Sequence, residues 1–434
     1  MTNDFDILVI GAGASGLMAA RELVKRNKKV AIIEARDRLG GRIHTSSEEG
    51  FTRQIETGAE FIHGNLPLTV ALLKEAGVRY NLLSGETYQV KKGKLLETDE
   101  FIDDFPELID KLKGLKSDMP FYDFLEIYFN DEKYRSLKKS VAMYAEGYDA
   151  ADIKKVSSFA LRDEWINESS SQAYRIEGGY KKLINFLSEE VISGGGLIYL
   201  SNAVKEIRCE GNKVEVICRG GKAFLSDKAI ITVPLGVLQS HHESESHIKI
   251  TPLLSGKVRD AIGKLGFGKV IKIFMEFKDS FWESRNFSGQ NIRRMPELDF
   301  VLSDAPIPTW WSQFPEDVPM LTGWLAGPKA VSFSEIGNTE VIRKAIESLS
   351  YIFGVNTSFL NLQIKTVKAV DWLNDPFALG AYSYTTVESS KALEVLRKPL
   401  NDKLYFAGEA IYQGNAMGTV EAALISGKHA AGLI

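Results

Sequence analysis

The segment "DFDILVIGAGASGLMAARELVKRNKKVAIIEAR", residues 4–36, constrains the fold of this chain more than any other. An apolar run at 7–10 leads into the spacing G-x-G-x-x-G, which is followed by an amphipathic stretch and a second apolar run. The order of strand, glycine turn, helix and strand is typical of a βαβ unit that binds a dinucleotide. The sequence therefore predicts an α/β protein with a Rossmann-like domain that includes this segment.

The three glycines of the motif each have a physical task. Gly11 allows the tight turn after the strand, Gly13 lets the backbone approach a pyrophosphate, and Gly16 permits close packing of helix on strand. The helix would then present free N–H groups and its positive dipole end to the phosphates, at Ala14 and Ser15. The glycine spacing by itself does not separate FAD from NAD.

An acidic residue, Glu34, ends the second apolar run, 18 residues beyond Gly16. A carboxylate at this point is expected to accept hydrogen bonds from the hydroxyl groups of an adenosine ribose. We therefore expect Glu34 to contact the cofactor, together with its neighbours Ala35 and Arg36.

The residues that follow narrow the choice of cofactor. The stretch "EARDRLGGRIHT" contains Arg38, Gly40, Gly41, Arg42 and Thr45 in the pattern R-x-G-G-R-x-x-T. This pattern resembles the flavin-containing amine oxidase family, which includes monoamine oxidases, polyamine oxidases and lysine-specific histone demethylases. The resemblance extends nearly end to end, through "IETGAEFIHGN", "AIITVPLGVL", "KVIKIFMEF", "DPFALGAYSY" and "LYFAGEAIYQGNAMGTVEAALISGKHAAG". It implies FAD as the cofactor.

The last of these stretches carries the second half of the expected cofactor site. Glu409 follows a buried strand and is placed to hold a ribitol chain. By resemblance, the helix that starts at 418–420 directs N–H groups to the pyrimidine edge of the flavin, where they stabilise the reduced ring. The resemblance also places Val204 beside the adenine. Beyond the first motif, it assigns to FAD the residues Gly40, Gly41, Arg42, Gly58, Ala59, Glu60, Phe61, Val204, Trp372, Gly408, Glu409, Gly418, Thr419 and Val420.

A lysine stands in the predicted strand "KVIKIFMEF", residues 269–277. Alternation places Lys272 on a mixed face, opposite an apolar face formed by Ile271, Ile273, Met275 and Phe277. By resemblance, Lys272 points through a water at flavin N5, and the mixed face looks into the cavity in front of the flavin. Glu276 is expected near the rim of that cavity.

Tyr382 corresponds to one wall of the aromatic cage found in this family. The opposite wall aligns with Thr419, which leaves the cage half open and resembles the histone demethylases. Ala381 stands where monoamine oxidases carry the cysteine that attaches their flavin, so non-covalent FAD is expected. We assign catalytic roles to Lys272 and Tyr382. The predicted substrate pocket comprises His63, Phe274, Trp324 and Thr419, although His63 and the tryptophans Trp310, Trp311 and Trp324 could instead be packing residues.

Cofactor motifs at both ends of the chain predict a discontinuous domain. We place the FAD-binding domain at 1–65, 174–240 and 372–434. The substrate-binding domain would occupy 66–173 and 241–371, with helices near 100–170 and a mixed sheet from 84–96, 269–277 and 319–326. Two domains also suit a chain of 434 residues.

The function implied by the resemblance is FAD-dependent oxidation of a primary or secondary amine, a monoamine or a polyamine. The amine would become an imine and then an aldehyde, with O₂ reduced to H₂O₂. An L-amino-acid oxidase or another oxidoreductase of the same fold remains an alternative, and an amino-acid oxidase needs an arginine clamp such as Arg162, Arg175 or Arg259. A flavin-binding protein without turnover is disfavoured by Lys272 and Tyr382. The long helical insertion of the histone demethylases is absent from the sequence.

The composition of the chain mainly argues against certain partners and sites. A net charge of -4 gives no reason to expect nucleic acid or an anionic membrane as partner. No apolar run reaches the roughly 18 residues of a membrane span, and His and Cys show no metal-ligand spacing. Cys209 and Cys218 flank a predicted hairpin in a register that does not favour a disulfide. We therefore expect a cytoplasmic enzyme without metal, which could form a homodimer.

Overall fold

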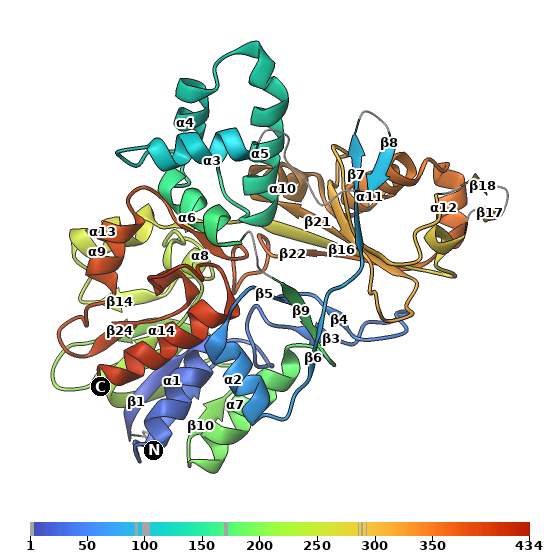
Figure 1. Cartoon of the computed structure of the whole chain (residues 1–434). Helices are drawn as coiled ribbons and strands as arrows, with labels where there is room; N and C mark the ends of the chain where they lie inside the picture. Colours follow the sequence, from blue (N-terminus) through green and yellow to red (C-terminus); the bar gives the residue numbers. More distant parts are fainter. Residues whose placement is uncertain are drawn as a thin grey trace.

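Two large β-sheets organise the chain. The structure, a computed structural model, describes residues 4–91, 94–97, 105–168, 172–284, 286–287, 290–291 and 293–434. One sheet has eight strands and the other seven. In Figure 1 the first lies at the lower left, the second at the right, and a group of helices stands above the first. The α/β fold predicted from the sequence is confirmed.

The eight-stranded sheet has the order β10-β2-β1-β13-β12-β11-β14, and β24 also pairs with β13. Its central pairs are parallel, and β2 and β24 are buried throughout, as expected for strands covered on both faces. The strands are β1 (Asp4–Ile10), β2 (Val30–Ile33), β10 (Leu197–Tyr199), β11 (Val204–Arg208), β12 (Val214–Cys218), β13 (Ala223–Ile231), β14 (Lys249–Thr251) and β24 (Leu404–Phe406). Helices α1 (Ala14–Val24), α7 (Lys181–Ser193) and α14 (Val420–Gly432) pack in one core with this sheet.

The two ends of the chain lie side by side in this region. Figure 1 shows α1 in blue against α14 in red. The helices approach closely, because a Cβ added to Gly427 would lie 2.1 Å from the backbone oxygen of Ser15. Gly427 therefore lets α14 pack tightly on α1.

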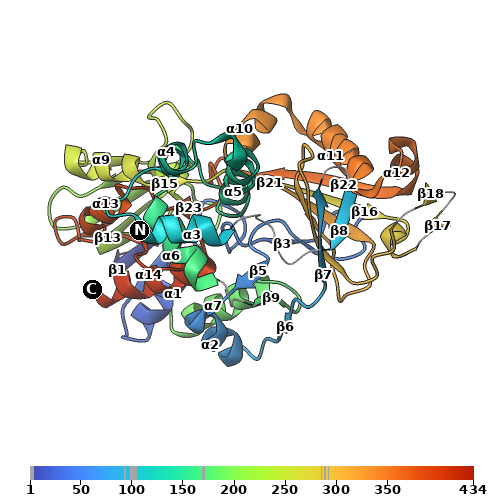
Figure 2. The same cartoon turned by 45° about the horizontal axis from the view of Figure 1, so that its top comes forward.

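The seven-stranded sheet has the order β22-β16-β21-β20-β19-β7-β8. Its strands are β7 (Glu86–Lys91), β8 (Lys94–Glu97), β16 (Val270–Phe277), β19 (Leu298–Leu302), β20 (Thr309–Trp311), β21 (Met320–Ala326) and β22 (Ile364–Asp371). The three strand segments predicted from the sequence are all in it, while positions 92–93 of the first segment lie outside the described residues. The predicted apolar face of β16 packs in one core with α11 and α12, and Figure 2 shows α10, α11 and α12 together over this sheet. These helices are α10 (Gly327–Ile336), α11 (Asn338–Phe353) and α12 (Thr357–Gln363).

Smaller elements complete the fold. The predicted helical stretch near 100–170 is confirmed by α3 (Phe105–Gly114), α4 (Phe121–Tyr128), α5 (Arg135–Tyr148) and α6 (Ser158–Glu168), while its positions 100–104 and 169–170 lie outside the described residues. Short sheets are formed by β3 (Thr45–Ser46) with β4 (Ile55–Glu56), by β5 (Phe61–His63), β9 (Ala173–Ile176) and β6 (Tyr80–Leu82), by β15 (Gly266–Phe267) with β23 (Ser383–Tyr384), and by β17 (Asn286–Phe287) with β18 (Gln290–Asn291). The remaining α-helices in the described part of the chain are α2 (Pro67–Glu75), α8 (Leu235–Leu238), α9 (Gly256–Lys264) and α13 (Ser389–Leu396).

Two segments assigned from the sequence to the substrate domain pack with the first sheet. Helix α2 buries Leu72 and Leu73 in the core of α1 and α14. Strand β14 pairs with β11, and α9 buries Val258 and Ile262 in the core on the other side of the sheet. We therefore propose that both segments belong to the cofactor domain.

Among the described residues, no helix is long and apolar enough to cross a membrane. Cys209 and Cys218 are both free thiols.

Candidate functional site

The glycine turn after β1 has the geometry that its sequence predicts. Gly11 has a φ of 108°, which a residue with a side chain rarely adopts. A Cβ added to Gly16 would lie 2.0 Å from the backbone oxygen of Gly11, so only glycine allows this approach of helix and turn. Beside it, a carboxylate oxygen of Glu34 accepts a hydrogen bond of 2.7 Å from the backbone N–H of Ala12.

The second glycine motif lies directly against the first. The N–H of Gly40 donates to the backbone oxygen of Ala12 at 2.9 Å, and Gly13 forms a parallel bridge with Gly40. Gly40 and Gly41 both have positive φ, so the chain turns back here in a conformation suited to glycine. The two motifs therefore form one backbone surface at the start of α1.

The start of α1 suits a diphosphate. Its N-cap residue, Gly13, provides no side-chain cap, and the first turn has no acidic residue. The hydroxyl oxygen of Ser15 is buried and has no hydrogen-bond partner among the described residues. Buried hydroxyl groups are normally paired, so an orphaned one beside free helix N–H groups fits a bound phosphate.

Arg42 links the N-terminal motifs to the C-terminal ones. Its guanidinium donates to a carboxylate oxygen of Glu409 at 2.8 Å and also to the backbone oxygen of Ala381. The other oxygen of Glu409 accepts from the N–H and hydroxyl of Ser383. A Cβ added to Gly58 would lie 1.9 Å from the backbone oxygen of Arg42. Cofactor residues predicted from separate motifs thus meet in one place.

The start of α14 lies beside Tyr382. Thr419 caps the helix, because its side chain accepts from the N–H of Ala422. Its own N–H donates to the backbone oxygen of Ala416, so it is not one of the free N–H groups predicted at 418–420. A Cβ added to Gly418 would lie 3.1 Å from the ring of Tyr382. The predicted catalytic tyrosine is therefore in contact with the helix start expected at the flavin.

Lys272 is fully buried, with 2% of its surface exposed. Its ammonium donates to the backbone oxygens of Glu56 at 2.6 Å and Gly58 at 3.2 Å, and forms an ion pair of 2.9 Å with Glu60. An ammonium has three N–H donors, and here each has a protein acceptor. Lys272 therefore lies next to the predicted cofactor segment 58–61, held by that segment.

Two expectations for the mixed face of β16 are wrong. Glu276 is not at a rim but 1% exposed, because the N–H and hydroxyl of Thr52 and the ammonium of Lys365 surround its carboxylate. Phe274 is 1% exposed and packs in a small core with Ile55, Val318 and Met320, so it does not line an open pocket.

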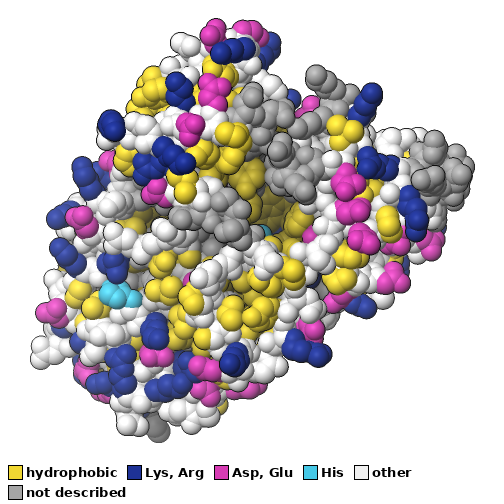
Figure 3. Space-filling model, viewed as in Figure 1, with side chains coloured by type: hydrophobic (Ala, Val, Ile, Leu, Met, Phe, Trp, Pro, Cys, Tyr) yellow, Lys and Arg dark blue, Asp and Glu magenta, His cyan; other side chains and the backbone are white. Residues whose placement is uncertain are grey.

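Six side chains form a closed series of contacts beside Lys272. Successive ring centroids lie 5.5 to 6.4 Å apart, and the hydroxyl of Tyr382 closes the series by donating to the backbone oxygen of Tyr148. Five of the six are only partly buried. In order, this aromatic ring series consists of Tyr382, Trp324, Trp311, Phe61, His63 and Tyr148. On the face seen in Figure 3, hydrophobic side chains line part of a hollow near the middle of the molecule.

The series brings together predicted pocket residues and residues that the sequence did not single out. Trp324 stacks on Tyr382 with an interplanar angle of 18°, and His63 contacts Phe61 and Tyr148. Burial lowers the pKa of His63 to about 4, so its imidazole is neutral at pH 7. Burial also raises the pKa of Tyr382 well above 10.

Other predicted residues have contacts of their own. The indole of Trp372 donates to the backbone oxygen of Thr57 at 2.8 Å, next to Gly58. Arg36 forms an ion pair with Asp375. Val204 is 7% exposed on β11, and nothing in the described contacts ties it to the other cofactor residues.

The sequence did not predict that Glu60, which it assigned to the cofactor, pairs with Lys272. Glu60 also pairs with Arg175 at 3.3 Å and accepts from the indole of Trp311 at 3.1 Å. Glu56 lies four residues before Glu60 and is another carboxylate in the same segment. No local signal linked the two residues, because Glu60 lies 212 positions from Lys272 in the sequence.

Glu56 provides a test of the charge around this segment. Burial raises the pKa of Glu56 to about 7, and one of its buried oxygens has no partner among the described residues. Because the folded state holds a proton that the unfolded chain has lost, stability falls as the pH rises from about 4.5 to about 7. Glu56→Gln should therefore raise the free energy of unfolding at pH 8 by up to about 3 kcal/mol, and leave it nearly unchanged at pH 4.

Denaturant unfolding at both pH values measures this difference. The exposed glutamate Glu49 gives a control, and Glu49→Gln should change stability little at either pH. An equal effect of Glu56→Gln at pH 4 and pH 8 would contradict a raised pKa.

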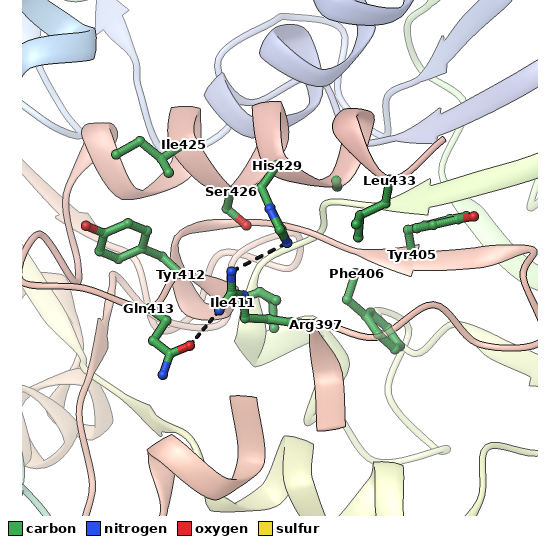
Figure 4. Close-up of a pocket in the computed structure, with 11 residues that line it drawn as sticks. Arg397, Tyr405, Phe406, Ile411, Tyr412, Gln413, Ile425, Ser426, His429 and Leu433 are labelled. Atoms are coloured by element: carbon green, nitrogen blue, oxygen red, sulfur yellow. Dashed lines mark hydrogen bonds between the residues drawn. The ribbon is translucent and has the colours of Figure 1, made fainter. Parts of the chain in front are cut away.

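A separate pocket lies at the surface beside α14 (Figure 4). Arg397 reaches across it, donating to Gln413 and meeting the imidazole of His429 at 3.4 Å. None of the predicted cofactor or substrate residues lines this pocket. Among the described residues, no group of three or more His, Cys, Asp or Glu could hold a metal ion.

Comparisons with known proteins agree with the geometry. A family model described as flavin containing amine oxidoreductase matches residues 14–434. The chain is 28% identical to lysine-specific histone demethylase 1 homolog 2 of Arabidopsis thaliana, over 97% of this chain and 57% of that protein. It is 28% identical to polyamine oxidase 2 of the same plant, over 99% of this chain and 88% of that protein. The chain thus spans little more than half the length of the first of these relatives.

Solved structures share the fold. Wild-type putrescine oxidase bound to putrescine superposes with a TM-score of 0.79 at 18% identity, covering 100% of this chain and 99% of that one. Cyclohexylamine oxidase from Brevibacterium oxydans IH-35A gives a TM-score of 0.77 at 18% identity, covering 99% and 98%.

Proposed function

The chain belongs to the flavin-containing amine oxidoreductase family, and we propose that it oxidises a C–N bond of a primary or secondary amine, a monoamine or a polyamine. FAD is the cofactor of this oxidoreductase. For a primary amine, the amine, O₂ and water would give an aldehyde, ammonia and H₂O₂. The observation that carries the proposal is the aromatic ring series, which contains Tyr382 and adjoins the buried Lys272.

Residues of both terminal motifs would hold the cofactor. The surface formed by the two glycine motifs would accept the diphosphate, and Glu34 the ribose. Glu409, fixed by Arg42 and Ser383, would lie at the ribitol, and the start of α14 at the pyrimidine edge. Bound FAD would supply the redox chemistry, accepting a hydride equivalent from the α-carbon of the amine.

The protein side chains would then position the amine. The neutral amine would lie beside Tyr382 within the aromatic ring series, whose partly exposed faces suit an alkyl or aromatic body. His63, neutral at pH 7, would add no charge that repels an amine. Lys272 would supply a fixed positive charge beside the flavin, favouring its reduced form and the reaction with O₂. FAD would be held without a covalent bond, because Ala381 stands where monoamine oxidases carry the cysteine that attaches their flavin.

The amino-acid oxidase alternative lacks support from the arginines. Arg175 is engaged by Glu60 and by the backbone oxygens of Ser312 and Phe314. Arg162 pairs with Asp163, and Arg259 is exposed on α9. None of the three is therefore placed to clamp a substrate carboxylate in this arrangement.

A peroxide-coupled screen tests the proposal. Purified yellow protein is offered monoamines, diamines, polyamines and L-amino acids, and H₂O₂ formation is measured for each. We expect turnover with at least one amine and at most a trace with amino acids. Anaerobic mixing with the same amines should bleach the flavin. A protein that stays oxidised with every amine would overturn the proposal and favour a flavin-binding protein without turnover.

A further inference from the structure

We infer that Glu60 is a positioning residue that holds Lys272 in place and sets the charge beside the flavin, so that the two act as one unit. The inference rests on the proposed function, because that function places Lys272 next to the flavin. The inference goes beyond the proposed function because it gives a redox role to Glu60, a carboxylate 212 positions away from Lys272 in the sequence.

The geometry joins the two residues tightly. A carboxylate oxygen of Glu60 lies 2.9 Å from the ammonium of Lys272, and both side chains are almost completely buried, at 5% and 2% exposure. The backbone oxygens of Glu56 and Gly58 take the other two donors of the ammonium. Since the side chain and the backbone of one segment satisfy all three N–H groups, Lys272 contributes its charge and not a free donor.

The second oxygen of Glu60 is also fixed. Arg175 lies 3.3 Å from it, and the indole N–H of Trp311 donates to it at 3.1 Å. Burial alone would raise the pKa of Glu60, but Lys272 and Arg175 outweigh burial and hold the pKa below its usual range. Glu60 is therefore charged, and its removal would leave Lys272 without its counter-ion in a buried position.

The pair has a structural counterpart on the same strand. Glu276 lies four residues after Lys272, on the same face of β16, and pairs with Lys365 at 2.7 Å. Four strand residues span about 13 Å, so this second pair is well away from Lys272. Glu276 is buried like Glu60, although its partner Lys365 is 45% exposed. Its variant therefore shows what the loss of a buried, paired glutamate does when that glutamate only stabilises the fold.

The test is the midpoint potential of purified, FAD-loaded protein, measured by reductive titration with a reference dye and without any amine. Glu60→Gln leaves the positive charge of Lys272 uncompensated, so the potential should rise. Lys272→Met leaves the negative charge of Glu60 without Lys272, so the potential should fall. We expect each change to alter the reduction equilibrium at least about tenfold, about 30 mV for a two-electron couple. Glu276→Gln should leave the potential unchanged while lowering the melting temperature.

The double variant Lys272→Met with Glu60→Gln keeps the test decisive if one single variant folds poorly. It removes both buried charges, so their opposite effects on the potential should cancel. The equilibrium constant for flavin reduction should then lie within about threefold of the wild-type value. Three results would each overturn the inference. The potentials of Glu60→Gln and Lys272→Met could equal that of the wild type, or the Glu276→Gln control could shift as much as they do. The double variant could also have the same potential as Lys272→Met. A yellow protein that oxidises no amine would reject the proposed function and still allow this test, whereas a colourless wild-type protein would reject both.

Discussion

Replacing Lys272 with methionine is expected to slow amine turnover at least about tenfold, which corresponds to about 1.4 kcal/mol of barrier. Methionine retains most of the length and the apolar character of the stem but removes the positive charge next to segment 58–61. The reduced flavin carries additional negative charge, and a fixed cation nearby stabilises it and the negative charge that develops on oxygen. FAD should remain bound, because the contacts of the glycine motifs and of Glu409 are unaffected.

Stopped-flow kinetics separate the two half-reactions of this variant. Flavin reduction by the amine and reoxidation by O₂ are followed at the flavin absorbance, and reoxidation should show the larger loss. Lys365→Met is the matched control, because it removes a lysine paired with a buried glutamate on the same sheet, and that glutamate lies about 13 Å along β16 from Lys272. Equal rates in wild type and Lys272→Met would remove Lys272 from the mechanism.

The fold was predictable because its signals are local. The glycine spacing at 11–16 demands a turn and a close helix contact, both of which the structure contains. Strict alternation in β16 gave the correct core face from Ile271 to Phe277. Two segments, α2 and β14, carried no local signal for the sheet on which they pack, because a helix or a short strand shows that it is amphipathic but not which partner it covers.

The sequence proposed residues for the site but did not predict the contacts between them. Alternation showed that Lys272 and Glu276 share a face, and both were expected to face a cavity or its rim. Both are buried with a partner from a distant segment, Glu60 for Lys272 and Lys365 for Glu276. Such pairing depends on how loops cross the strand, which periodicity cannot reveal. For the same reason Phe274 was placed in the pocket, whereas Trp311 and Tyr148 belong to the aromatic ring series.

Replacing Gly16 with alanine is expected to abolish FAD binding and to lower the free energy of unfolding by about 3 kcal/mol or more. The new Cβ would lie 2.0 Å from the backbone oxygen of Gly11 and 2.9 Å from the hydroxyl of Thr232, far inside van der Waals contact. Both neighbours are constrained, since Gly11 is in the turn itself and the Thr232 hydroxyl donates to Ile10. Helix α1 must therefore move away from the turn, which separates its free N–H groups from the second glycine motif.

The ratio of flavin to protein absorbance measures the loss of FAD, and denaturant unfolding measures the loss of stability. Gly263→Ala is the matched control: Gly263 lies in α9, and a Cβ added there meets nothing within 4 Å. This control should bind FAD normally and gain about 0.5–1 kcal/mol, because alanine favours a helix over glycine. Purification of Gly16→Ala with a full complement of FAD would contradict this prediction. The phosphate site would then not require the close approach of helix and turn, and FAD binding would have to depend on Glu34, Arg42 and Glu409 alone.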